Sequence, residues 1–421
     1  MKQLKPTSAK EIYFWNIIGS GINALLSVLL LLAVSLFLNS EDGDTFSIAW
    51  SFGMQAATIG IFQVRLYQAT DINEVYCFRQ YLYIRLITVF FMLVYTIYYV
   101  LSKDFSIYKC TVILLVCLSR AVDAFSDLFQ GWYQQKQRLD LSGKVMTAHA
   151  LVSILIFGIS LFLSRNLIFS CFMMLLGHLV VFIVFDYQYF RPMAQIHDPR
   201  SRTASDRTFS ILLTCFPLFL NGFIIMDIFN SPKFAIDSAI STGILPDGSQ
   251  MIYNILFMPA FVLNLAFIAL RPMITDLAVS WNSNQIRDFF RRIWNICKLL
   301  LLFSLVVLLL GWFLGCPCLS LVYNVPLSDH RAVLMIIIVG GLFNAFMYFL
   351  DNVITVIRKH SLLIIAYLIT WLYTRIVVNP LVDAYGLLGA SVSFASSMLL
   401  LLLITTILFC ISLFCTLRKK A

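Results

Sequence analysis

Residues 295–315 read NICKLLLLFSLVVLLLGWFLG, a stretch of 21 residues with one charged side chain, Lys298. A helix that crosses the hydrocarbon core of a bilayer needs about 20 mostly apolar residues, so this stretch predicts a transmembrane helix. The whole chain has the same character, because 60% of its 421 residues are hydrophobic and only 12% are charged. Soluble domains carry about 25% charged residues. The composition therefore predicts an all-α polytopic membrane protein, and it excludes a soluble enzyme, a nucleic-acid-binding domain, a secreted disulfide scaffold and a disordered regulator.

Similar apolar stretches predict about twelve transmembrane helices. They cover residues 11–38, 46–66, 80–101, 110–130, 144–163, 166–186, 209–229, 250–270, 295–315, 332–356, 361–379 and 387–416. The loops between them hold at most about 25 residues, which is too short for a soluble catalytic domain. Segment 281–294 is expected either as an interfacial helix on the inner leaflet or as an extension of the ninth span.

The distribution of Lys and Arg predicts the orientation. If the N-terminus is inside, 23 of the 30 basic residues fall in inner segments and 5 in outer ones, and only Arg120 and Arg375 lie within spans. Cytoplasmic loops of membrane proteins carry such an excess of Lys and Arg. Both termini are therefore predicted to be cytoplasmic.

A basic segment divides the chain between the sixth and seventh spans. The predicted domains are an N-terminal six-helix lobe at 1–190, a basic cytoplasmic linker at 191–207 and a C-terminal six-helix lobe at 208–421. An even number of spans in each half makes the halves parallel, related by an axis along the membrane normal.

The fourth span carries a polar face. Arg120, Asp123, Asp127, Gln130 and Gln134 follow at spacings of three and four residues, which confines them to an arc of about 80° on a helix. A charged side chain at the bilayer centre costs about 2.5–3.5 kcal/mol on insertion scales. This face must therefore point toward protein or toward a water-filled cavity. The alternative to a functional site is a local ion pair between Arg120 and Asp123, with the polar face holding helices together.

Spans one, three and ten carry further polar stripes at helical spacing. They consist of Asn16, Gly19, Ser20, Asn23 and Ser27; of Tyr81, Arg85, Thr88, Met92, Tyr95 and Tyr99; and of Asn344, Tyr348, Asp351, Asn352 and Thr355. Together the stripes predict a central polar cavity between the lobes. His149 and His178 are single histidines in spans five and six, interpreted as structural, with a proton relay as the alternative.

The chain contains no Walker A sequence, no zincin motif and no long outer loop with paired carboxylates. These motifs carry nucleotide and metal chemistry. The sequence therefore predicts a protein that is not an enzyme, with no cofactor and no metal.

Four segments resemble the polysaccharide-biosynthesis membrane proteins, the Wzx-type flippases of the multidrug/oligosaccharidyl-lipid/polysaccharide (MOP) exporter superfamily. They are RLYQATD at 65–71, DLFQGWYQQKQRLDLSGK at 127–144, NSPKFAID at 230–237 and YNILFMPAF at 253–261. The resemblance implies twelve helices in two lobes, and it implies translocation of a polyprenyl-pyrophosphate-linked oligosaccharide across the bacterial cytoplasmic membrane by alternating access. The implied partners are membrane lipid, H⁺ or Na⁺ and other glycan-assembly membrane proteins.

That cargo suggests roles for the polar residues. A pyrophosphate needs cations and a sugar needs hydrogen-bonding groups and aromatic surfaces. The candidate substrate-binding residues are Arg65, Arg85, Arg120, Asn16, Asn23, Tyr81, Tyr95 and Asp127. Asp123 and Asp351 are candidates for ion coupling. Asp123 and Asp127 could also neutralise Arg120, which leaves its role as a phosphate ligand open.

Three other functions remain as alternatives. A cation-coupled exporter of small molecules, of the multidrug type, would need an acidic and aromatic pocket. A membrane-embedded polymerase or glycosyltransferase would need a long outer loop with Arg or carboxylates, and the sequence has none. A scaffold for glycan assembly would tolerate substitution of Arg85 and Arg120.

Overall fold

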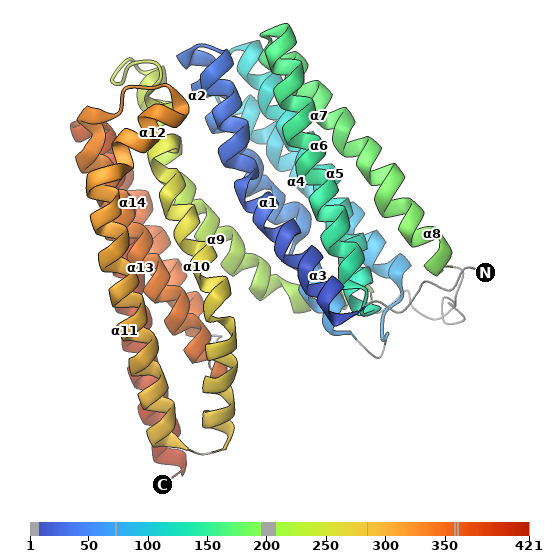
Figure 1. Ribbon diagram of the computed structural model, residues 1–421, viewed down its shortest axis with the longest axis vertical. Helices are drawn as coiled ribbons and strands as arrows, with labels where there is room; N and C mark the ends of the chain where they lie inside the picture. The colour runs from blue at the N-terminus through green and yellow to red at the C-terminus, as the bar shows by residue number, and fades with distance from the viewer. Residues whose placement is uncertain are drawn as a thin grey trace. The chain divides into compact units, whose positions relative to one another are not determined.

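The computed structural model describes residues 8–71, 74–194, 208–283, 285–357, 359 and 362–420. Within these ranges side chains are described except at 9, 192–194, 208, 261–272, 274–276, 278, 282 and 415–420. The described backbone is almost entirely helical (Figure 1). It forms two compact units, Met1–Met226 (unit 1) and Asp227–Ala421 (unit 2). Most of the predicted linker at 191–207 lies outside the described residues, and the predicted division of the chain at that linker stays a prediction.

The described part of unit 1 contains eight α-helices before the start of a ninth. They are α1 (Ala9–Phe37), α2 (Ser40–Ile61), α3 (Val64–Thr70), α4 (Phe78–Leu101), α5 (Ile107–Gln135), α6 (Leu139–Ser164), α7 (Leu167–Val181) and, after the π-helical turn η1 (Phe182–Tyr187), α8 (Gln188–Ala194). Several begin at a side-chain cap: Ser8, Asn39, Ser106 and Asn166 each accept a bond from a backbone N–H of the first turn. Such caps satisfy donors that the helix itself leaves free.

Unit 2 begins within α9 (Thr208–Ser241). It continues with α10 (Ser249–Asn282), α11 (Ile286–Leu310), the π-helical turn η2 (Gly311–Gly315), α12 (Cys316–Tyr323), the 3₁₀ turn η3 (Ser328–His330), α13 (Arg331–Val356) and α14 (Leu363–Lys420). Because α11 runs without a break from Ile286 into the ninth predicted span, residues 286–294 of the predicted segment 281–294 are an extension of that span and not a separate interfacial helix. Trp281 belongs to the end of α10.

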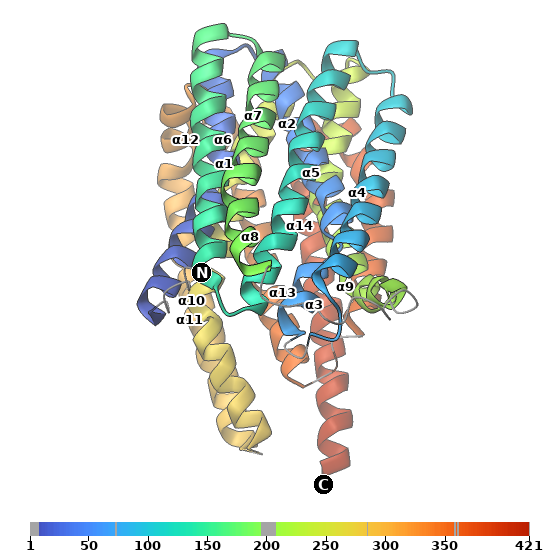
Figure 2. The ribbon, with the colours of Figure 1, turned by 90° about the vertical axis from the view of Figure 1, so that its right-hand side faces the viewer.

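In unit 1, α1 packs along α6 and α2 packs along α5 (Figure 1 and Figure 2). The α1–α6 contact is close at Gly143, where a Cβ atom would lie 2.5 Å from the backbone carbonyl of Trp15. Small residues allow membrane helices to approach in this way, because association within lipid depends on packing and hydrogen bonds. The packing leaves α5 enclosed by α2, α4, α6 and α7.

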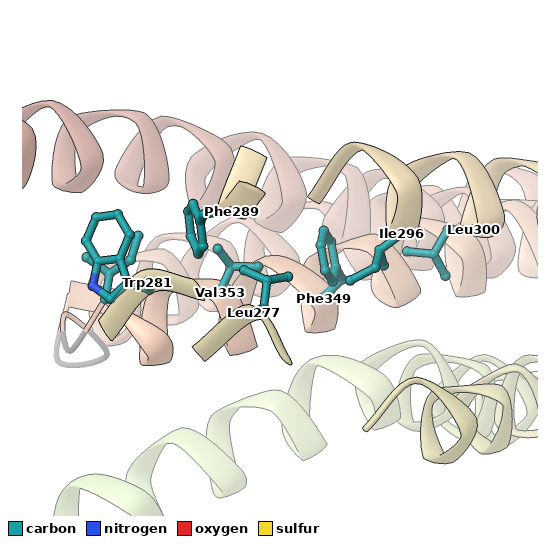
Figure 3. Packing of buried hydrophobic residues seen from close by; sticks show 8 residues of the cluster. Leu277, Trp281, Phe289, Ile296, Leu300, Phe349 and Val353 are labelled. Atoms are coloured by element: carbon teal, nitrogen blue, oxygen red, sulfur yellow. The ribbon is translucent and has the colours of Figure 1, made fainter. Parts of the chain in front are cut away.

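In unit 2, an apolar cluster joins α10, α11 and α13. Its buried members are Leu277, Trp281, Phe289, Ile296, Leu300, Phe349, Val353 and Ile357. Figure 3 shows these side chains in a row along the helices, with the rings of Trp281 and Phe289 near one end. Those two rings have centroids 4.8 Å apart. The cluster attaches the first part of α11 to α10 and α13.

The 58 residues of α14 form two antiparallel arms. Gly386 has φ 58° and ψ −133°, which are not helical values. The hydroxyls of Thr374 and Ser397 lie 2.8 Å apart, although 23 residues of straight helix would separate them by about 34 Å. The chain therefore reverses near Gly386. Glycine is also required at Gly389, where a Cβ atom would lie 1.8 Å from the carbonyl oxygen of Leu381.

Eight helical segments among the described residues are long and apolar enough to cross a membrane. With α2, α5 and α10, and with α14 counted as two arms, the described chain has twelve segments of spanning length. α5 holds three charged side chains between Arg120 and Asp127, which makes it less apolar than a lipid-facing helix. The prediction of an all-helical polytopic membrane protein is confirmed.

Candidate functional site

The charged face of α5 lies inside unit 1. Arg120 and Gln130 are 8% and 7% exposed, and Asp123 and Asp127 are partly buried beside them. α3, α4, α6, α7 and η1 all pack against this helix. The prediction that this face points toward protein and not toward lipid therefore agrees with the packing. The carboxylates of Asp123 and Asp127 organise two groups of polar side chains.

Asp127 holds two arginines. Its Oδ2 accepts a bond of 3.0 Å from Nη2 of Arg85, which is fully buried. Its Oδ1 lies 3.4 Å from Nη1 of Arg65, which also donates to the side chain of Gln130 at 2.9 Å. The second amino group of Arg65 donates to Ser142 at 3.0 Å. Two of the three arginines predicted to bind phosphate, Arg65 and Arg85, are thus paired with protein groups, although the side chain of Arg65 is 25% exposed.

A break between α2 and α3 supplies a further acceptor for Arg85. Phe62 and Gln63 adopt left-handed conformations with φ of 47° and 54°, and so α2 ends at this point. The carbonyls of a helix's last turn have no partner within the helix. The carbonyl of Gly60 accepts from Arg85 Nη1 at 2.5 Å and from the hydroxyl of Thr88 at 2.8 Å. The helix end therefore fixes the buried guanidinium.

Asp123 pairs with an arginine and a histidine of unit 1. Its Oδ2 lies 2.8 Å from Nη1 of Arg120, as the spacing of three residues predicts. The guanidinium of Arg120 also lies 4.2 Å from the ring centroid of Trp50, within cation–π distance. The other carboxylate oxygen accepts from Nδ1 of His178 at 2.6 Å and lies 3.7 Å from Nδ1 of His149.

Asp186 completes this second group from the turn η1. Its carboxylate is fully buried, and it lies 3.0 Å from Nε2 of His149 and 3.0 Å from the hydroxyl of Ser126. The hydroxyl of Tyr133 donates to the backbone carbonyl of Asp186 at 2.5 Å. A π-helical turn inside a helix is frequent at functional sites. We call Arg120, Asp123, His149, His178 and Asp186 the histidine–aspartate cluster.

The remaining predicted site residues lie outside this cluster. Tyr81 is buried and its hydroxyl donates to Asp71 at 2.9 Å. Tyr95 stacks on Phe52 with ring centroids 5.4 Å apart. On α1, Asn16 is half-buried and Asn23 is exposed. Asp351 belongs to α13 of unit 2.

The convergence of the two histidines was not predicted. His149 and His178 were interpreted as single structural residues and Asp186 was not singled out, yet the two imidazole rings lie 5.5 Å apart and both contact carboxylates. The sequence contained one signal of this cluster. Asp186 follows His178 by eight residues, about two helical turns, which indicates that both side chains lie on one side of the helix. The pairing with Asp123, 55 residues before His178, is a tertiary contact that spacing does not reveal.

Three of these residues also offer metal-ligand atoms. The ligand atoms of Asp123, His149 and His178 all lie within 4.8 Å of one another. Imidazole nitrogen and carboxylate oxygen are the ligand types that zinc accepts. The 2.6 Å between Asp123 and His178 is, however, a hydrogen-bond distance.

No protein-family model matches this sequence, and no curated protein matches it at the sequence level. Solved structures do share its fold. An inward-facing multidrug resistance MATE family transporter of the MOP superfamily aligns with a TM-score of 0.67 and 11% identity, over 96% of this chain and all of the other. The Vibrio cholerae MATE transporter VcmN aligns with a TM-score of 0.61 and 14% identity, over 96% of this chain and 97% of its own.

A third similar structure is a MOP superfamily transporter from Pyrococcus furiosus, described as having a binding pocket of reversed polarity that suggests a different function. It aligns with a TM-score of 0.57 and 11% identity, over 96% of this chain and 94% of the other. The chain is thus a multi-pass membrane protein that shares the fold of these solved transporters. At these identities the likeness establishes the fold, and the function must be argued from the residues.

Proposed function

We propose that this protein is a membrane transporter that works by alternating access and is coupled to a cation. The observation that carries the proposal is the histidine–aspartate cluster, which brings a buried and a partly buried carboxylate, two imidazoles and a guanidinium together among helices of spanning length. Ionisable groups at membrane depth are costly and mark ion or substrate pathways. A fold of two units suits alternating access, in which one helical bundle rocks against the other.

The substrate class that the geometry supports best is a small organic molecule of the multidrug type. Two observations favour it. The similar solved structures include multidrug resistance transporters. In addition, Arg85 and Arg120, which sequence analysis assigned to a pyrophosphate, each bind a carboxylate of the same unit. Their charge is therefore compensated within the protein.

A lipid-linked oligosaccharide is the second candidate substrate. It is favoured by the sequence segments at 65–71 and 127–144, which resemble Wzx-type flippases, and by Arg65 within the first of them. That side chain is partly exposed and its contact with Asp127 is long at 3.4 Å. Arg65 is the most exposed of the three arginines predicted to bind phosphate, and a phosphate group would replace its bonds to Gln130 and Ser142. On either proposal the protein acts in the cytoplasmic membrane as a transporter and not as a polymerase or glycosyltransferase.

One experiment separates the two substrates. Host cells that lack the protein are complemented with wild type, Asp123→Asn or Arg65→Gln, and two quantities are measured: energy-dependent efflux of ethidium, and polyprenyl-pyrophosphate oligosaccharide in each leaflet. Ethidium efflux that depends on wild type and fails with Asp123→Asn supports the exporter. Accumulation of the glycan on the inner leaflet, cured by wild type but not by Arg65→Gln, supports the flippase. If neither quantity responds to the protein, the proposal of these two substrates is wrong.

A further inference from the structure

We infer that the first part of α11 is a binding site for an anionic phospholipid, formed by Arg291, Trp294 and Lys298 and extended by Arg287. We call these four residues the basic face of α11. The site lies on the side of the membrane that the distribution of Lys and Arg predicts to be cytoplasmic. The inference concerns contact with the membrane, and it does not depend on which molecule the protein transports.

The four residues of the basic face lie on one side of α11. They follow one another at steps of four, three and four residues, which confines them to an arc of about 60° at 100° per residue. The opposite side of the helix packs within unit 2, where Phe289, Ile296 and Leu300 are buried in the apolar cluster with α10 and α13 (Figure 3). This packing turns the basic face away from the cluster and toward the surroundings of unit 2.

A stripe of exposed leucines continues the basic face along the helix. Leu301, Leu305 and Leu309 lie on the same side of α11, and each is more than half exposed. On a helix that crosses a membrane, exposed apolar side chains of this kind are covered by lipid tails. A phospholipid whose acyl chains lie along these leucines therefore brings its headgroup to the basic face.

The depth of the basic face matches that of the headgroups. The continuous helical run from α11 to the end of α12 has no charged residue between Leu299 and Tyr323, and about 20 residues cross the hydrocarbon core. The polar layer adds about 5–8 Å on each side of the core. Trp294 lies about 6 Å and Arg291 about 10 Å before Lys298 along the helix axis. Tryptophan is enriched at this depth in membrane proteins.

A cation–π contact positions the lysine for a phosphate. Side chains of a helix lean toward its N-terminus, which here means away from the hydrocarbon core. The ammonium of Lys298 accordingly lies 5.5 Å from the ring centroid of Trp294. The indole is 59% exposed, so that its N–H and the ammonium are both open to a ligand. Phosphate oxygens accept charge-assisted hydrogen bonds from Lys and Arg.

The charge of the segment also suits an anion. Residues 286–298 contain four basic side chains and one acidic side chain, Asp288. Asp288 lies 2.9 Å from Nη2 of Arg291, but these two side chains are 40% and 73% exposed. Exposed ion pairs contribute little, and a phosphate can take the place of the carboxylate. Four or more basic residues next to the cytoplasmic end of a span are typical of segments that bind anionic lipids.

The other end of the same helical run provides a matched control. Arg331 lies 5.7 Å from the ring centroid of Trp312, so it also forms a cation–π pair. It is the only Lys or Arg between Lys298 and Arg358 in the sequence. A single cation of this kind lacks the neighbouring positive charges of the basic face.

The test measures how strongly lipids quench the fluorescence of Trp294. Full-length protein in detergent micelles is mixed with phosphatidylglycerol or phosphatidylcholine whose acyl chains carry bromine, which quenches indole fluorescence on contact. The chain has seven tryptophans, so the Trp294 signal is the difference between each protein and the same protein with Trp294→Phe. We expect half-quenching at a mole fraction of phosphatidylglycerol at least about tenfold below that of phosphatidylcholine, since each basic residue near the surface contributes a factor of about five.

Three variants show whether the basic face causes this preference. Arg291→Gln/Lys298→Gln should abolish it, whereas Arg291→Lys/Lys298→Arg keeps both charges and should keep it. Arg331→Gln should leave it unchanged. Equal quenching by phosphatidylcholine in the wild type and in the first variant shows that Trp294 still faces the lipid and that the helix is intact.

Three results would overturn the inference. Equal quenching of wild-type Trp294 by both lipids means that the basic face does not select a headgroup. Loss of the preference in an excess of inorganic phosphate, compared with sodium chloride at the same ionic strength, means that the site binds a free anion. Displacement of phosphatidylglycerol by an equimolar amount of polyprenyl pyrophosphate means that the occupant is a lipid-linked substrate and not a lipid of the membrane.

Discussion

Two interior clusters show how differently the units use the same kind of helix. In unit 1, α5, α6, α7 and η1 meet around ionisable side chains that are paired with one another. In unit 2, α10, α11 and α13 meet around eight side chains, none of them ionisable. Unit 2 also buries ionisable side chains, among them Asp227, Lys233 and Asp237, but outside this apolar cluster. The residues inside a bundle, and not the fold, thus decide whether a given interior cluster is charged.

The strongest test of the charged interior removes the carboxylate between Arg65 and Arg85. Asp127→Ala leaves the fully buried guanidinium of Arg85 without its counter-ion. Breaking a buried ion pair from one side costs about 3–5 kcal/mol. We expect a loss of this size in the free energy of unfolding, measured by tryptophan fluorescence in mixed detergent micelles.

The double variant Arg85→Met/Asp127→Leu is the control for this prediction. Replacing both charges by apolar groups removes the uncompensated ion, so most of the stability should return. If Asp127→Ala is as stable as wild type, Arg85 has another counter-ion and the account of the charged interior is wrong.

The apolar interior is tested at Phe349, which is fully buried in the unit 2 cluster. Phe349→Ala should lower the free energy of unfolding by about 3 kcal/mol, the low end for such cavities. We expect the low end of this range because lipid tails are as apolar as the phenylalanine side chain. The substitution therefore removes mainly packing contacts and little hydrophobic free energy. Phe349→Leu fills most of the space and should cost less than half as much in the same assay. Equal losses for the two variants would argue against a packed cluster.

Close helix packing is tested by a matched pair of glycines in α6. A Cβ atom at Gly143 would lie 2.5 Å from the backbone of Trp15, whereas a Cβ atom at Gly158 meets nothing within 4 Å. We expect Gly143→Ala to cost about 1–3 kcal/mol through overpacking. Gly158→Ala should be neutral or slightly stabilising, since alanine has the higher helix propensity. The two thermal unfolding midpoints, compared in one detergent, measure the difference.

The smallest effect is expected where charges meet at the surface. Lys144 and Glu11 lie 2.8 Å apart with side chains 25% and 44% exposed. Exposed pairs of this kind contribute about 0–1 kcal/mol. Glu11→Ala, which removes the more exposed partner, should therefore change the unfolding free energy by less than about 1 kcal/mol. A loss as large as that of Asp127→Ala would show that buried and exposed charges contribute equally to stability.

Much of the fold could be predicted from the sequence, because membrane helices are defined by length and composition along the chain. The twelve predicted spans correspond to helices, and the i to i+3 contact of Arg120 with Asp123 follows from helical spacing. The break after α2 was not predicted. Phe62 and Gln63 are ordinary residues in left-handed conformations, and nothing in their side chains signals this.

The candidate site could be predicted only in part, since a helix face is local but its partners are not. The polar face of α5 was recognised, and so was the alternative that its carboxylates neutralise Arg120. Its contacts with His178, 55 residues away, and with Arg65, 62 residues before Asp127, depend on which helices pack together. A single sequence does not contain that information in its periodicity.

Because the chain reverses at Gly386, the last two membrane crossings run in opposite directions. The first arm of α14 has about 23 residues and would span about 34 Å, enough for a hydrocarbon core of about 30 Å. Two such arms return the chain to the side from which it came, so residues 362 and 420 share one face of the membrane. A topology reporter fused after Lys420 therefore shows on which side of the membrane the C-terminal residues lie, and the α13–α14 connection lies on that same side. A residue with a Cβ atom at Gly389 would collide with the Leu381 carbonyl, so one glycine supports the sidedness of the whole C-terminal tail.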